Sequence, residues 1–327
     1  MTKGKALARE ALARLAELDE VARGIYEAMP PTPQRVWPLL AGRAGAELWI
    51  KHENHTPIGS FKARSGLAYV ARLRREDPSA RGLVAATRGN FGQSVAFAGR
   101  RHGLRSVMVV PSGNSAEKNA AMKALGAELV EHGADFQDAY EYAQRLSGEQ
   151  GLHMVRSFGR ELWLGTASYG LELLRAVADL EAIYVPIGQG SGICGVIAAR
   201  DALGSKARVV GVAAANAAAY ALSFAAGRAV STDSANTIAD GMACRVPDPE
   251  ALAIIQRGAD RVVTVSDEEI RAAMRYYFTD THNVAEGAGA AALAAVLQER
   301  NAVRGRKVAA VLTGGNVDAP VYREVLG

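Results

Sequence analysis

The sequence predicts an α/β protein in which helices cover parallel β-sheets. Short apolar runs alternate with helix-length segments along most of the chain, a rhythm typical of parallel strands joined by helices. Some of these runs lead directly into glycine-containing turns, as expected where strands pass into helices at a ligand site. A chain of 327 residues, 49% of them hydrophobic, is long enough for two lobes, because single cores stop growing near about 250–300 residues.

The predicted strands are short apolar runs bounded by turn residues. In chain order they cover residues 48–52, 106–110, 128–131, 183–187, 209–213, 262–265 and 308–313, with a further apolar run at 83–86. We expect a ligand to bind at the carboxyl ends of these strands, between the two lobes.

Composition excludes several other classes of protein. The segment from Lys3 to Tyr26 predicts an amphipathic helix that contains acidic residues, unlike a signal peptide. No stretch approaches the ~18 uncharged apolar residues of a membrane span, so we expect a cytoplasmic protein. The net charge of +4 is scattered and does not suggest nucleic acid. Two cysteines, Cys194 and Cys244, argue against a disulfide framework.

The run from Gly59 to Arg64 places Lys62 at the predicted start of a helix. Lysine normally titrates near pKa ~10.4 and reacts poorly with carbonyls at pH 7. Burial lowers that pKa and frees the amine for Schiff-base chemistry. Ser60 is expected to be the N-cap, and Gly59 allows a flat ligand to approach the backbone. A short G-S-x-K run alone is more often a solvated lysine, so this hypothesis depends on the segments below.

The turn from Gly188 to Gly192 follows an apolar run and precedes a helix of small residues. Successive backbone N–H groups at a helix N-terminus bind one phosphate. Residues 190–195 also match the G-x-G-x-x-G pattern of dinucleotide sites. That interpretation requires an acid at the end of the next strand, where residues 211–216 offer none. We therefore favour a single phosphate over a dinucleotide.

Two further loops present polar groups at the ends of apolar runs. Residues 86–94 place Asn90 between two glycines, where its amide and the backbone N–H groups could bind a small anion or a phenol oxygen. Thr313 precedes a double glycine, and its hydroxyl could hydrogen-bond a heterocyclic nitrogen. Taken singly, each loop also fits an ordinary structural role.

Together these segments resemble the pyridoxal-phosphate enzymes of the tryptophan-synthase-β type (fold type II), and within them the serine/threonine dehydratase family. Residues 51–64 are similar to the family signature K-x-E-N-x-x-P-T-G-S-F-K-x-R, with Ile58 in place of Thr. The other matching segments are residues 87–93 (the family's S-S-G-N-H-x-Q), 188–192 (its tetraglycine phosphate loop), 238–243, 286–291 and 313–316. The resemblance runs through most of the chain.

The resemblance implies a large cofactor-binding domain of residues 1–81 and 159–327, and a small inserted domain of residues 82–158 that closes over the substrate. It implies that Lys62 bonds to the aldehyde of pyridoxal 5'-phosphate and later acts as acid and base. The implied cofactor-binding residues are Phe61, Lys62, Asn90, Gly188, Gln189, Gly190, Ser191, Gly192, Glu286 and Thr313. The implied substrate-binding residues are Thr87, Arg88, Gly89 and Asn90.

Individual roles also follow from the resemblance. Phe61 would pack beside the cofactor ring, and Asn90 would hydrogen-bond its phenolic oxygen. The backbone of residues 87–90 would take the substrate carboxylate. Thr313 would face the pyridine nitrogen, and Glu286 would lie near the cofactor or the departing hydroxyl.

Further positions depart from the family pattern. Arg88 stands where racemases carry a proton-donating serine; an arginine stays protonated and is a poor acid or base, so racemization is disfavoured. Arg88 could instead bind a substrate carboxylate, including a second one as in 3-hydroxyaspartate, or pair with a neighbouring acid. Phe91 replaces the usual His and makes the pocket more apolar. Ala213 and Ala214 stand where cation-binding members carry an acid, so no metal is expected.

The expected function is that of a pyridoxal-phosphate-dependent dehydratase. A threonine hydroxyl at the ring nitrogen makes a weaker electron sink than an aspartic acid would, which suits elimination. We expect L-threonine or L-serine to be converted to a 2-oxo acid and ammonia by a homodimer or homotetramer. Alternatives are dehydration of 3-hydroxyaspartate or phenylserine, racemization, β-replacement, and a silent protein that binds the cofactor or a nucleotide.

Overall fold

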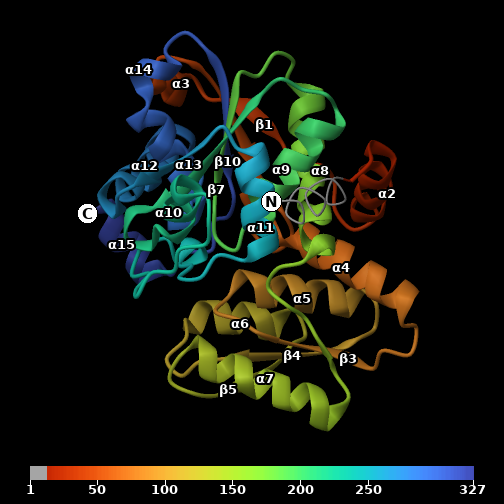
Figure 1. The fold of residues 1–327 in the computed structure, drawn as a ribbon. Coiled ribbons are helices and arrows are strands. Elements are labelled where there is room, and N and C mark those ends of the chain that lie inside the picture. Colours follow the sequence, from red (N-terminus) through yellow and green to blue (C-terminus); the bar gives the residue numbers. More distant parts are fainter. Residues whose placement is uncertain (1–12) are drawn as a thin grey trace.

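The computed structural model describes residues 13–327. The predicted N-terminal helix is present from Leu15 to Tyr26 as α2; its expected part from Lys3 to residue 12 lies outside the described residues. Figure 1 shows two lobes, with the helices α5, α6 and α7 gathered around one sheet and most other elements around a second.

Within residues 13–327, the larger sheet has six strands in the order β1-β2-β10-β7-β8-β9. All neighbours are parallel except β1 and β2. The strands are β1 (Gln34–Val36), β2 (Glu47–His52), β7 (Ala182–Pro186), β8 (Arg208–Ala214), β9 (Arg261–Val265) and β10 (Lys307–Leu312). The α/β class predicted from the sequence is confirmed, and the predicted strands end within one residue of the observed ones.

Helices cover both faces of this sheet because its central strands are apolar on both sides. In β10, Val308, Ala310 and Leu312 face one core, while Ala309 and Val311 face the other. The first core is closed by α3 (Pro38–Ala44), α12 (Asp267–Thr281), α13 (Gly287–Gln298) and α15 (Ala319–Leu326), and the second by α2, α8 (Arg160–Ala176), α9 (Ser191–Ala202) and α11 (Pro249–Gly258). Shorter helices near this sheet are α10 (Ala219–Ala226), α14 (Arg300–Val303) and the 3-10 turns η1 (Glu53–His55), η2 (Ala215–Ala217) and η3 (Asp240–Met242).

The smaller sheet has the order β5-β4-β3-β6 among the described residues, and all its pairs are parallel. Its elements are β3 (Gly82–Ala86), α5 (Asn90–Arg101), β4 (Arg105–Val110), α6 (Ala116–Ala124), β5 (Glu128–Glu131), α7 (Phe136–Gln150) and β6 (His153–Met154). All of them lie within the segment 82–158 predicted as the inserted domain, whose boundaries stay a prediction.

Helix α4 (Lys62–Glu76) lies at the boundary between the two lobes (Figure 1). Its residues Ala63, Leu67 and Val70 share a core with strands of the smaller sheet. On its other side, Gly165 of α8 approaches the carbonyl of Arg64 so closely that a Cβ there would have no room. A helix assigned by sequence to the large domain therefore packs against both lobes.

A buried ion network fixes the start of α4. The Arg64 side chain has no exposed surface, and its Nε donates to Glu53 Oε2 at 2.7 Å. Its Nη1 donates to Glu172 Oε1 at 2.6 Å, and Lys51 Nζ donates to the other oxygen of Glu172 at 2.5 Å. Because two cations meet two carboxylates, the network is neutral, and it joins β2, α4 and α8.

None of the described helices has the length and apolar character needed to cross a membrane.

Candidate functional site

The turn that carries Lys62 is hydrogen-bonded to the turn after β10. Phe61 N–H donates to the carbonyl of Thr313 at 2.9 Å, and Gly315 N–H donates to that of Gly59 at 2.9 Å. Gly59 has φ of +67°, and a Cβ there would lie 2.6 Å from the side chain of Asn316. Only glycine satisfies both conditions at this position.

Ser60 does not cap helix α4, so that expectation is wrong. Phe61 occupies the N-cap position without a side-chain cap, and the Ser60 hydroxyl lies 3.5 Å from Lys62 N. The turn is held instead by Thr56, whose Oγ1 accepts from Ser60 N–H at 2.9 Å and donates to the Ser60 carbonyl at 2.7 Å. A residue four positions upstream performs this role because the chain turns before the helix begins.

The Lys62 amine lies between two aromatic rings. Its Nζ is 5.2 Å from the ring centre of Phe61 and 5.9 Å from that of Phe91. Nζ has no hydrogen-bond partner among residues 13–327. Burial lowers the pKa of Lys62, and the charge of Glu286 opposes that shift. A larger share of Lys62 is therefore neutral and nucleophilic than in an exposed lysine.

The turn from Gly188 to Gly192 connects β7 to α9. Three of its carbonyls accept from side-chain hydroxyls: Tyr220 donates to Gln189 at 2.9 Å, Thr166 to Ser191 at 2.7 Å and Tyr169 to Gly192 at 3.0 Å. These three hydroxyl donors were not predicted from the sequence, because they come from distant helices.

No N–H group of residues 188–192 has an acceptor within the described chain. Gly190, Ser191 and Gly192 are nevertheless buried, and buried N–H groups without partners are rare in proteins. A Cβ on Gly188 would collide with the carbonyl of Gly241. This turn thus fits an anion such as the cofactor phosphate.

Asn90 and Glu286 meet across the two lobes. The Asn90 amide nitrogen donates to both carboxylate oxygens of Glu286, at 2.9 and 3.0 Å. Asn316 donates to Asn90 Oδ1 at 2.7 Å. Burial raises the pKa of Glu286, although Lys118, Asn90 and Lys62 oppose the shift. The amide predicted to face the cofactor's phenolic oxygen is therefore engaged by a carboxyl group that readily holds a proton.

The loop after β3 has only some of its N–H groups free. Thr87 N–H donates to Val109, and the Thr87 hydroxyl oxygen accepts from Gly89 N–H at 3.0 Å and Gly92 N–H at 2.9 Å. The backbone N–H groups predicted to bind a carboxylate at Thr87 and Gly89 are thus already used. Those of Arg88, Asn90 and Phe91 have no acceptor within residues 13–327.

Thr313 directly follows β10 and is buried. Its carbonyl holds Phe61, whereas its hydroxyl has no hydrogen-bond partner in the described part of the chain. This free hydroxyl is suited to a heterocyclic nitrogen.

A cavity of about 250 Å³ opens between the lobes and is lined by Arg88, Lys118, Asp240, Glu286 and Asp318. Lys118 Nζ donates to Asp240 Oδ2 at 3.2 Å, and Ser115 donates to Asp318 at 2.7 Å. Lys118 and Ser115, both in the smaller lobe, were not predicted as site residues. No side-chain cluster in residues 13–327 has the composition of a metal site.

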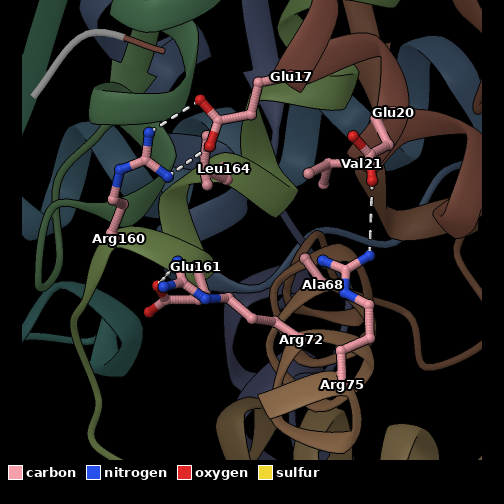
Figure 2. Close-up of a pocket in the computed structure, with 9 residues that line it drawn as sticks. All are labelled: Glu17, Glu20, Val21, Ala68, Arg72, Arg75, Arg160, Glu161 and Leu164. Atoms are coloured by element: carbon pink, nitrogen blue, oxygen red, sulfur yellow. Dashed lines mark hydrogen bonds and ion pairs between the residues drawn. The ribbon is translucent and has the colours of Figure 1, made fainter.

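A second cavity, of about 320 Å³, lies between α2, α4 and α8 (Figure 2). Its three arginines are each paired with a glutamate. The pairs are Arg160 with Glu17, Arg72 with Glu161, and Arg75 with Glu20. These charges compensate one another, and the cavity lies further along α4 than Lys62.

The turn of residues 188–192, the buried Lys62 amine and the free Thr313 hydroxyl all follow parallel strands of the larger sheet at their carboxyl ends. Residues 25–314 match the model of a family described as pyridoxal-phosphate dependent enzyme. The chain belongs to this family. The predicted family and cofactor are confirmed.

Relatives within the pyridoxal-phosphate family narrow the class further. L-threonine ammonia-lyase of Thermotoga maritima is 33% identical over 95% of this chain and 78% of its own length. The biosynthetic L-threonine dehydratase IlvA of Haemophilus influenzae is 31% identical over 92% of this chain and 59% of its own length. The chain thus spans only part of that relative. These homologues indicate a pyridoxal-phosphate-dependent lyase.

Solved structures confirm the fold expected for this family. The processed form of threonine deaminase isoform 2 from Solanum lycopersicum has a TM-score of 0.87 and 28% identity, covering 96% of this chain and 94% of that one. A pyridoxal 5'-phosphate-dependent aspartate racemase has a TM-score of 0.89 and 28% identity, covering 94% and 97%. The two-lobed fold of the tryptophan-synthase-β type is therefore shared by lyases and racemases.

Proposed function

We propose that this protein is a dehydratase that converts a β-hydroxy amino acid, with L-threonine or L-serine as expected substrates, to a 2-oxo acid and ammonia. The observation that carries the proposal is the position of Lys62, a partly desolvated amine on the same edge as the phosphate-binding turn and Thr313. The named activities of the ammonia-lyase and dehydratase relatives support it.

Pyridoxal phosphate would be held by the N–H groups of residues 188–192 and would supply an aldehyde for Lys62 and an electron-withdrawing ring. Lys62 then removes the proton from the substrate's Cα. The Thr313 hydroxyl can donate a hydrogen bond to the ring nitrogen but cannot give it a full proton. A ring nitrogen held by Thr313 would therefore be a weaker electron sink than one held by an acid, which favours prompt loss of the β-hydroxyl group.

Glu286 is the proposed proton donor for the departing hydroxyl. Burial raises the pKa of its carboxyl group, so it holds a proton at higher pH than an exposed glutamate does. The Asn90 amide orients both of its oxygens. A protonated carboxyl at this position would turn hydroxide into water as the bond to Cβ breaks.

The substrate's α-carboxylate would be bound by the loop after β3. The donors would be the free N–H groups of Arg88, Asn90 and Phe91. The N–H groups of Thr87 and Gly89 are excluded because they already have acceptors within the protein. The Thr87 hydroxyl oxygen accepts two hydrogen bonds, and its proton is available as a further donor.

Release of 2-oxo acid from L-threonine and L-serine by the cofactor-loaded protein tests the proposal. Lys62→Ala should abolish the release and keep the circular dichroism of the folded protein, whereas Lys123→Ala, an exposed lysine of α6, should change nothing. Turnover retained in Lys62→Ala would overturn it. Appearance of the D-amino acid without 2-oxo acid would favour a racemase, and cofactor binding without any product would favour a silent binding protein.

We also propose, from the family resemblance, a cytoplasmic homodimer or homotetramer that needs no nucleic-acid partner. Light scattering of the purified holoenzyme and fractionation of the source cells would test these two points.

A further inference from the structure

Arg88 is a cation without a partner in the cavity between the lobes. Its side chain is exposed and makes no hydrogen bond or ion pair with residues 13–327. Lys118, the other cation of this cavity, is already paired with Asp240. Of the two cations that line this cavity, Arg88 is therefore the one without an ion pair in residues 13–327.

None of the acids that line the cavity pairs with Arg88 within residues 13–327. Asp240 accepts from Lys118, Asp318 accepts from Ser115, and both oxygens of Glu286 accept from Asn90. Each carboxyl group thus has a donor within the protein. The Arg88 guanidinium is therefore open to an anion from outside the chain.

The α-carboxylate of the substrate does not require the Arg88 side chain. The free N–H groups of Arg88, Asn90 and Phe91, together with the Thr87 hydroxyl, already provide donors for one carboxylate. The Arg88 guanidinium begins in the same loop but lines the cavity beside Glu286. Its planar pair of donors matches a second carboxylate.

The neighbouring Lys118 strengthens this arrangement. Its stem packs on Gly89, where a Cβ would lie 2.5 Å from Lys118 Cδ. An ammonium group and a guanidinium group of the smaller lobe therefore line the same cavity, next to the loop for the α-carboxylate.

We propose that Arg88 forms a subsite for an acidic group on the substrate's Cβ, so that the enzyme also accepts dicarboxylic β-hydroxy amino acids such as 3-hydroxyaspartate. The inference rests on the proposed dehydratase function. The reaction needs no oxidant. A proton leaves Cα and hydroxide leaves Cβ, which together make water. The enamine that results takes up a proton at Cβ to become an imine, and water hydrolyses the imine to the 2-oxo acid and ammonia. The product is a 2-oxo dicarboxylic acid.

The test compares 2-oxo acid release from threo-3-hydroxyaspartate and from L-threonine in the cofactor-loaded wild type, Arg88→Ala and Arg88→Lys. A charge-assisted pair of this kind predicts a loss of about 10- to 100-fold in the hydroxyaspartate-to-threonine ratio of kcat/KM for Arg88→Ala. Arg88→Lys should lie between, because lysine keeps the charge and loses the planar fork. Arg81→Ala is the matched control, because Arg81 is an exposed arginine directly before β3 and outside both cavities.

Binding of L-aspartate, which has no β-hydroxyl group to lose, gives a readout other than turnover. Quenching of tryptophan fluorescence would measure this binding. The wild type should bind L-aspartate more tightly than L-2-aminobutyrate, and Arg88→Ala should reverse that order. Turnover of threonine with no turnover of hydroxyaspartate, or an unchanged ratio in Arg88→Ala, would overturn this inference and leave the dehydratase intact. No 2-oxo acid from either substrate would instead remove the proposed function.

Discussion

Replacing Arg64 with Met should destabilise the protein severely, although Arg64 itself is not a proposed catalytic residue. The side chain is fully buried and donates to Glu53, Glu172, Ser168 and Thr32. Methionine fills much of the same volume but leaves both carboxylates without their main cation. The loss of stability in Arg64→Met therefore reports mainly the missing positive charge and not a loss of packing.

The magnitude follows from the burial of the network. Removing one partner of a buried ion pair costs about 3–5 kcal/mol, because the other charge stays uncompensated. Burial alone would raise the pKa of Glu172, but Arg64 and Lys51 outweigh it and hold the pKa below its usual value. Without Arg64 that pKa rises in the folded state. The stability lost in the variant should thus be largest near neutral pH and should shrink as the pH falls and Glu172 is protonated.

Urea unfolding of wild type and Arg64→Met at about pH 5 and about pH 8 measures the effect. Arg72→Met is the matched control, because Arg72 lies on the same helix but is 36% exposed in its pairs with Glu76 and Glu161. That surface position should cost less than ~1 kcal/mol. A loss in Arg64→Met no larger than in Arg72→Met, or a loss that grows as the pH falls, would refute the reasoning.

Three further predictions concern the site. Gly188→Ala should weaken cofactor binding at least about tenfold in a titration, because its Cβ collides with Gly241; Gly148→Ala, where space is open, should not. Lys118→Met should raise KM more than it lowers kcat, because it removes the ion pair to Asp240 across the lobes. High salt should also raise the KM of the wild type, because it screens this pair. Glu286→Gln should remove the fall in kcat that the wild type shows as the pH rises through the raised pKa of this carboxyl; an unchanged pH profile would exclude Glu286 as the proton donor.

The parts of the site that the sequence predicted are local in the chain. The turn at 188–192 and the position of Lys62 follow from contiguous motifs, and the parallel strands follow from contiguous apolar runs. The parts that were missed depend on distant contacts. Tyr220 and Thr166, which lie on other helices, donate to carbonyls of the turn at 188–192. Lys118 donates to Asp240 from the other lobe. Strands as short as β1 and β6 have too few residues to produce a readable pattern.

Hydrogen bonds between the Lys62 turn and the turn after β10 join residues about 250 positions apart in sequence. The nucleophile and the Thr313 hydroxyl are therefore parts of one rigid unit, and neither is in place until β10 has entered the sheet between β2 and β7. A nascent chain that has not yet reached Gly315 would carry Lys62 and the phosphate turn without the backbone that orients them. We therefore expect the cofactor to bind only after β10 has joined the large sheet.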